Sequence, residues 1–185
     1  MSFEQVVRIP QDRIGVLVGK EGNIKNEVEE TCSVNLTIDS ETGIVNITTK
    51  GDVSKTEPFK AINIVTAISR GFSPERAFKL LNDDIILEVI DLRDYVGKSK
   101  SALTRIRGRI IGLNGKSRKL IEELSGGYLS VYGYTAAVIG TSGETKSAGD
   151  AVKMLASGSA HRTVYKKLQQ SRTKAKLDRL KLWEE

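Results

Sequence analysis

An ungapped internal repeat is the feature that most constrains this sequence. Residues 15–30 align with residues 108–123 at a constant offset of 93, so that three glycines, two glutamates and three apolar pairs coincide. A second, shorter match places 71–79 beside 158–166, now at an offset of 87. Matches of this kind indicate that one folding unit occurs twice in the chain. The change of offset indicates that the two copies differ in the lengths of their loops.

The hydrophobic pattern predicts the same order of elements in both copies. A β-branched run at 6–9 or 85–92 predicts an opening strand, which is followed by a short apolar helix, a glycine loop and an amphipathic helix. The second helix, the two later strands and the closing helix are then expected at 23–31, 33–39, 44–49 and 59–71 in the first copy and at 116–124, 128–132, 136–140 and 148–156 in the second. The order β-α-α-β-β-α predicts an α+β fold in which a three-stranded antiparallel sheet packs on three helices.

The polar run that begins at Asn82 predicts the boundary between the copies, which gives domains 1–82 and 83–185. Two segments distinguish the second copy from the first. One is an insertion at 94–107, of which 100–107 has helical propensity and no predicted role. The other is the basic stretch 162–183, for which we expect a helix or a frayed tail.

Each copy carries a Gly-x-x-Gly loop between its first two helices. The loops are Gly19-Lys20-Glu21-Gly22 and Gly112-Leu113-Asn114-Gly115. Glycines remove side chains where a sugar-phosphate backbone has to approach the main chain, and the helix that follows points unpaired N–H groups toward the phosphates. A single Gly-x-x-Gly most often only caps a helix. Two copies in the same context favour a clamp for a nucleic-acid backbone.

The charge is unevenly divided between the copies. The chain has a formal net charge of +6, but residues 1–82 carry 10 Lys and Arg against 11 Asp and Glu, a net of −1, and residues 83–185 carry 19 against 12, a net of +7. A basic half of a globular chain is typical of a polyanion-binding surface. We therefore expect the second loop to dominate binding of a nucleic-acid backbone. Its candidate contacts are Gly112, Leu113, Asn114, Gly115, Lys116, Ser117, Arg118, Arg107, Arg109 and Ile111.

The first loop is less suited to binding a phosphate backbone. Its candidate contacts are Gly19, Lys20, Glu21, Gly22 and Lys25. Glu21 would repel a phosphate that approached it, so this loop is expected to bind a nucleic-acid backbone weakly or to serve mainly in packing.

Other functional classes find little support in the sequence. A Walker A loop would need a glycine five positions before Gly115, and that residue is Ile110. With one cysteine, Cys32, and one histidine, His161, no disulfide or Cys/His zinc site forms within the chain, and no cofactor or catalytic group is predicted. No run is long and apolar enough to cross a membrane, and we expect a cytoplasmic, non-enzymatic protein.

The β-α-α-β-β-α order with Gly-x-x-Gly between the first two helices resembles the type I KH domain, here in two tandem copies. The runs 107–126, 128–133 and 137–140 are similar to the archaeal members of the partner-of-NOB-one family of ribosome-assembly proteins. The resemblance implies binding of single-stranded RNA near the 3′ end of small-subunit rRNA. It also implies cooperation with the endonuclease that matures this end, and contact with the α subunit of translation initiation factor two.

Two other hypotheses stay open from the sequence. In one, the first domain and the basic tail dock an acidic protein and RNA binding is secondary. In the other, the second loop is an atypical phosphate site of a nucleotide-using enzyme. The salt dependence of binding to single-stranded RNA would separate them, because each phosphate contact adds about −0.7 to the slope of log K against log salt.

Overall fold

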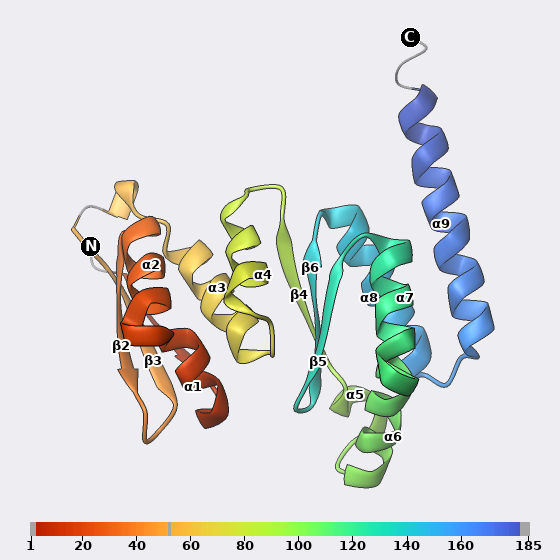
Figure 1. Ribbon diagram of the computed structural model, residues 1–185, viewed down its shortest axis with the longest axis horizontal. Helices are drawn as coiled ribbons and strands as arrows, with labels where there is room; N and C mark the ends of the chain where they lie inside the picture. The colour runs from red at the N-terminus through yellow and green to blue at the C-terminus, as the bar shows by residue number, and fades with distance from the viewer. Residues whose placement is uncertain (1–2, 52, 182–185) are drawn as a thin grey trace. The chain divides into compact units, whose positions relative to one another are not determined.

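The structure is a computed structural model that describes residues 3–51 and 53–181. The chain divides into two compact units between Asp83 and Asp84. Each unit is built from one three-stranded sheet and the helices that pack on it (Figure 1).

The first unit contains the predicted sheet and helices. Its elements are β1 (Glu4–Arg8), α1 (Gln11–Val18), the 3₁₀ turn η1 (Lys20–Gly22), α2 (Asn23–Thr31), β2 (Val34–Asp39), β3 (Ile44–Thr49), η2 (Val53–Lys55), α3 (Pro58–Ser69), α4 (Pro74–Ala77) and η3 (Phe78–Leu81). The strands are antiparallel in the order β1-β3-β2. Because side chains alternate along a strand, Val34 and Leu36 in β2 and Val45 and Ile47 in β3 are all buried on one face. Helices α2 and α3 pack against this sheet.

The second unit repeats this arrangement. Its elements are β4 (Ile86–Asp91), α5 (Arg93–Val96), α6 (Lys100–Ile111), the 3₁₀ turn η4 (Leu113–Gly115), α7 (Lys116–Ser125), β5 (Tyr128–Tyr132), β6 (Thr135–Gly140), α8 (Ser142–Ala156) and α9 (His161–Lys181). The strands are antiparallel in the order β4-β6-β5.

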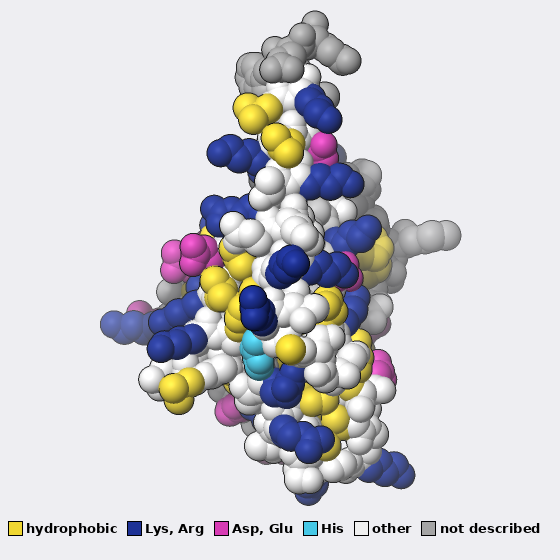
Figure 2. Space-filling view, turned by 90° about the vertical axis from the view of Figure 1, so that its right-hand side faces the viewer, with side chains coloured by type: hydrophobic (Ala, Val, Ile, Leu, Met, Phe, Trp, Pro, Cys, Tyr) yellow, Lys and Arg dark blue, Asp and Glu magenta, His cyan; other side chains and the backbone are white. Residues whose placement is uncertain are grey.

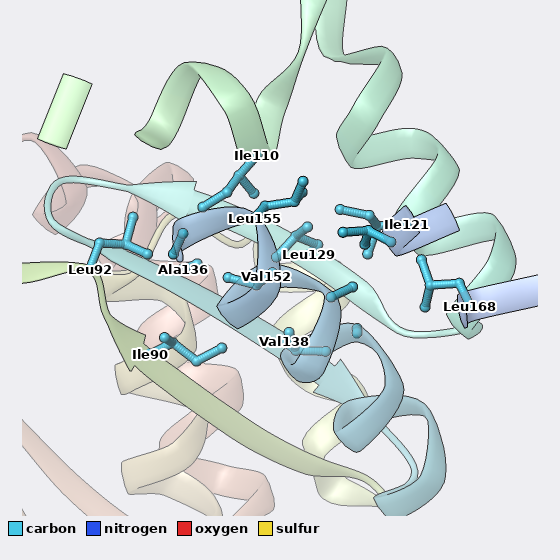
Figure 3. Close-up of a cluster of buried hydrophobic side chains, with 14 of the residues drawn as sticks. Ile90, Leu92, Ile110, Ile121, Leu129, Ala136, Val138, Val152, Leu155 and Leu168 are labelled. Atoms are coloured by element: carbon cyan, nitrogen blue, oxygen red, sulfur yellow. The ribbon is translucent and has the colours of Figure 1, made fainter. Parts of the chain in front are cut away.

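One aliphatic cluster holds the helices of the second unit to its sheet. Figure 3 shows Leu129 and Val138 of the sheet facing Ile110, Ile121 and Val152 of helices α6, α7 and α8. Each of these five side chains is at most 1% exposed. Full burial of an aliphatic side chain contributes about 1.5–3 kcal/mol, so this cluster fixes the direction in which α6 and α7 enter and leave the glycine loop.

One predicted boundary in the second unit was wrong. The closing helix begins at Ser142 and not at Ala148, because Thr141 and Glu144 form a capping box: the Thr141 hydroxyl accepts from the Glu144 N–H, and the Glu144 carboxylate accepts from the Thr141 N–H. The helix predicted from propensity at 100–107 is confirmed. It forms the first two turns of α6, which has 12 residues where α1 has 8.

The basic stretch after Gly158 is helical. Helix α9 packs against α7 and α8 through buried Val164 and Leu168, and every residue from 169 to 181 is exposed. Trp183, the end of the predicted segment, lies outside the described residues.

Candidate nucleic-acid interface

The second Gly-x-x-Gly loop joins α6 to α7 through a sharp change of backbone conformation. Gly112, Asn114 and Gly115 have φ angles of +72°, +52° and +74°. The combination at Gly112, φ +72° with ψ 174°, is strained for any residue with a side chain, whereas asparagine tolerates the left-handed region found at position 114. Backbone geometry alone therefore explains the glycines at both ends of the loop.

Gly112 lies directly on the helix that follows the loop. A Cβ at this position would be 2.7 Å from Ser117 Cβ and 2.8 Å from the Ser117 backbone nitrogen. Ser117, which the sequence predicted to contact RNA, is only 4% exposed beneath the loop. Its Oγ has no hydrogen-bond partner among the residues that the structure describes.

The two middle residues of the loop project outward. Leu113 is 76% exposed, and Asn114 is exposed as well. Helix α7 begins at Lys116 immediately after the loop, and no side chain caps its N-terminus. The first N–H groups of a helix have no partner inside it, so they carry a partial positive charge toward this surface. The loop thus presents bare main chain at the positive end of a helix.

The predicted basic side chains around this loop fall into two groups. Lys116 is exposed, as are Arg105 and Lys119 nearby, and these cations are available to solvent. Arg118 is half-buried and forms an ion pair of 3.1 Å with Glu122. Arg107 is also half-buried, and its Nε has no hydrogen-bond partner within the described part of the chain. Ile111, a half-buried residue, ends α6.

Arg109 is used by the fold of the second unit. Its guanidinium donates to the carbonyl of Leu155 at 3.3 Å and to that of Ser159 at 2.6 Å, and its own carbonyl lies 2.8 Å from His161 Nε2. Arg13 of the first unit makes the equivalent pair of bonds, to the carbonyls of Ile68 and Phe72. Both arginines therefore tie the helix before the loop to the end of the closing helix. Because its guanidinium is held within the fold, we expect no RNA contact from Arg109.

The paired glutamates of the repeat also have a structural role, which the sequence analysis missed. Glu122 accepts from the Leu129 N–H at 2.8 Å, and Glu29 accepts from the Leu36 N–H at 2.6 Å. Each carboxylate thereby links the helix after the loop to the following strand. Glu29 also lies 4.0 Å from Lys25, so this predicted contact of the first loop is beside an acid.

The first loop has nearly the same backbone as the second. Gly19, Glu21 and Gly22 have φ angles of +74°, +55° and +79°. Lys20 and Glu21 are exposed, and α2 begins directly after the loop without a side-chain cap. Its outward surface carries one cation and one carboxylate, so its charge attracts a phosphate less than that of the second loop.

Each unit has one glycine inside the helix that precedes its loop, with open space beside it. Gly15 of α1 and Gly108 of α6 each lie four residues before the first glycine of a loop, and nothing lies within 4 Å of where a Cβ would be. A glycine in a helix interior costs about 1 kcal/mol relative to alanine. The fold therefore offers no reason for these glycines, which leave a bare patch of helix one turn from each loop.

The remaining polar candidates lie apart from this surface or are buried. Tyr128 and Tyr132 are half-buried on the strand face opposite Leu129, and Arg93 stacks 3.8 Å above the ring of Tyr134. Cys32 is 1% exposed, and burial raises the pKa of its thiol to about 11. Across residues 3–51 and 53–181 there is no cluster of potential metal ligands, and no helix there is long and apolar enough to cross a bilayer.

The second unit matches a family described as eukaryotic-type KH domain, KH domain type I, over residues 86–173. An α+β unit with a three-stranded antiparallel sheet and a Gly-x-x-Gly loop between two helices is the KH class of RNA-binding module.

The whole chain has relatives of the same organisation. It is 43% identical over 179 residues to the KH domain-containing protein MJ0443 of Methanocaldococcus jannaschii, covering 97% of this chain and 78% of that protein. It superposes on Dim2p from Pyrococcus horikoshii with a TM-score of 0.82 and 49% identity, covering 91% and 99% of the two chains. A structure of an a/eIF2alpha-aDim2p-rRNA complex from the same archaeon gives a TM-score of 0.86 and 47% identity, covering 94% and 96%. The chain belongs to the Dim2p-like, partner-of-NOB-one family of KH proteins of ribosome assembly.

Proposed function

We propose that this protein binds single-stranded small-subunit rRNA, near its 3′ end, by clamping the RNA backbone on the loop Gly112–Gly115. The observation that carries the proposal is the exposed second loop, in which bare glycines, an uncapped helix N-terminus and exposed cations occur together. The rRNA in the complex of the P. horikoshii relative supports the choice of RNA. The role is that of a non-enzymatic assembly factor.

The first unit is proposed to be a second type I KH domain. Its boundary, expected between residues 82 and 83, lies one residue before the division between the two compact units. This domain is supported by the repeated sheet order and the near-identical backbone of its glycine loop. Its proposed contacts, Gly19–Gly22 and Lys25, contribute less affinity than the second loop because Glu21 and Glu29 lie among them.

A double substitution in the second loop tests the clamp. Leu113→Asp with Asn114→Asp places two carboxylates where the phosphates would lie, and we expect RNA affinity to fall by at least about 100-fold. The fold should survive, because Leu113 is exposed and aspartate, like asparagine, tolerates a positive φ. Fluorescence anisotropy with a labelled oligoribonucleotide of the rRNA 3′ end measures the affinity, and circular dichroism checks the fold.

The matched change in the first loop is Lys20→Asp, since Lys20 corresponds to Leu113. It should weaken binding by about threefold or less. An unchanged affinity in the Leu113/Asn114 variant would refute the clamp. An equal loss in the Lys20 variant would refute the ranking of the two loops.

A second function, binding of the translation initiation factor two α subunit, is favoured by helix α9. The relative that forms a complex with a/eIF2alpha is 47% identical to this chain. Figure 2 shows Lys and Arg side chains on both flanks of α9 and hydrophobic side chains near its far end. Leu177 and Leu180 are 52% and 54% exposed, one helical turn apart. Exposed leucines among cations are typical of a helix that docks in an acidic-rimmed apolar groove.

Leu177→Asp with Leu180→Asp tests this role of α9. We expect calorimetric binding to the P. horikoshii α subunit to be lost, while RNA affinity changes by less than about threefold. The matched control is Gln170→Asp, an exposed residue on the same helix. Full retention of α-subunit binding in the double variant would exclude α9 as the docking element.

A further inference from the structure

The hydroxyl of Ser117 is buried and stabilises no other part of the described fold through a hydrogen bond. Ser117 is 4% exposed, and its Oγ has no hydrogen-bond partner within the described residues. A buried polar group without a partner destabilises the folded state, and most proteins avoid it. Other buried hydroxyls of this chain are satisfied: Ser69 Oγ donates to the carbonyl of Thr66 at 2.6 Å, and Thr145 Oγ1 to that of Gly140 at 3.1 Å.

The first loop shows that the fold does not require a hydroxyl at this position. At the offset of 93, Ser117 corresponds to Ile24. Ile24 lies under Gly19 as Ser117 lies under Gly112, since a Cβ at Gly19 would be 2.5 Å from Ile24 Cγ1. The two loops have the same backbone, so an apolar side chain supports this geometry equally well.

The position of Ser117 places its hydroxyl near the N-terminal end of α7, where a phosphate would bind. Ser117 is the second residue of α7, in the turn whose N–H groups face the loop. Arg107, on the helix before the loop, likewise has a buried Nε–H without a partner in the described chain. Both groups can donate hydrogen bonds, and a phosphate supplies only acceptors. In the first unit the residue at the position of Arg107 is Ile14, which is buried.

We infer that Ser117 donates its hydroxyl to a phosphate oxygen of bound RNA, a bond that forms only in the complex. The inference rests on the proposed function of the second loop. Because Gly112 covers Ser117, the loop has to shift slightly for the phosphate to reach the Oγ. Ser117 is thus a phosphate-binding residue, kept at some cost to stability, that distinguishes the second clamp from the first.

Opposite effects on stability and affinity test this role. In the full chain, Ser117→Ala removes an unsatisfied hydroxyl, so the midpoint of urea unfolding should rise. The same substitution should weaken binding of the rRNA 3′-end oligonucleotide by about 10-fold, the effect of one hydrogen bond to a charged acceptor. Because the hydroxyl is neutral, the slope of log K against log salt should not change, whereas Lys116→Ala should reduce its magnitude by about 0.7.

Ser69→Ala is the matched control, because it removes a buried hydroxyl that has a partner. This variant should unfold at lower urea and keep its RNA affinity. Ser117→Ile, which installs the residue of the first loop, should behave like Ser117→Ala in RNA binding.

The inference is overturned if Ser117→Ala lowers the unfolding midpoint or leaves RNA affinity unchanged. Failure of the clamp itself gives a different result. In that case the Leu113→Asp, Asn114→Asp variant would bind RNA as well as the native protein, whatever Ser117→Ala does.

Discussion

Glu21 and Asn114 occupy the same place in the two Gly-x-x-Gly loops, with φ angles of +55° and +52°. The residues before them are Lys20 and Leu113, and those under the first glycine are Ile24 and Ser117. The main chain is therefore repeated closely, while the side chains in and beneath the two loops differ. Asparagine tolerates a positive φ better than glutamate does, so the second loop is also the less strained of the two.

This difference shows which part of a repeated motif carries function. The glycines are required by the backbone, since each first glycine contacts the helix beneath it, and they would be kept whether or not RNA binds. Affinity for a phosphate depends instead on charge and hydrogen-bond donors, which the fold leaves free to vary. Two identical loop conformations therefore do not imply two equal binding sites.

The largest expected effect comes from changing the first glycine of each loop. Gly112→Ala adds a side chain at positive φ, where its Cβ would meet Ser117, and we expect about 2–4 kcal/mol less stability and no measurable RNA binding. Urea unfolding and fluorescence anisotropy measure the two quantities.

Gly19→Ala is the counterpart in the first loop, and it tests whether the two loops differ in RNA binding. The added Cβ would lie 2.5 Å from Ile24 Cγ1, so a similar loss of stability is expected. RNA affinity should stay within about threefold of the native value. A loss of binding as complete as that of Gly112→Ala would mean that both loops hold RNA.

Local signals in the sequence were enough to predict most of this architecture. Helix α2 at Asn23–Thr31 and strands β3 at Ile44–Thr49 and β5 at Tyr128–Tyr132 have the predicted bounds, because each combines a clear hydrophobic period with a turn on either side. The start of α8 was missed because its signal, Thr141 with Glu144, lies in a Gly- and Ser-rich run that looks like a loop.

Only those parts of the site that depend on local sequence could be predicted. The glycine loops follow from spacing. The structural use of Arg109 depends on carbonyls 46 and 50 residues away, and the burial of Ser117 depends on how the loop folds back on α7. A count of nearby cations treats such residues as equivalent, whereas tertiary contacts separate those that face solvent from those that hold the fold.

A smaller effect on RNA affinity is expected at the two helical glycines, Gly15 and Gly108, which allow a closer comparison of the two loops. Gly15→Ala and Gly108→Ala should each stabilise the protein by about 0.5–1 kcal/mol, because each added Cβ meets open space in a helix. Gly108→Ala should weaken RNA binding by about fivefold, since we expect RNA bound at the second loop to approach the bare turn of α6 that precedes it. Gly15→Ala should leave affinity unchanged. An unchanged affinity in Gly108→Ala would show that RNA does not approach the bare turn of α6, and an equal loss in both variants would show that both loops bind RNA.

The smallest expected effect concerns stability in alkaline solution and the first unit alone. Burial, with a smaller contribution from Glu57, raises the pKa of Cys32 from 9.0 to about 11. Above pH 9 the unfolded chain loses the thiol proton while the folded chain keeps it, so stability falls as the pH rises from about 9 to 11 and is unaffected below that range. At pH 9.5 the loss should be on the order of 1 kcal/mol. Urea unfolding of the native protein and of Cys32→Val, compared at pH 7.5 and 9.5, isolates this contribution from the other groups that titrate there. Equal pH dependence in the two proteins would mean that the thiol ionises as readily in the folded unit as in the unfolded chain.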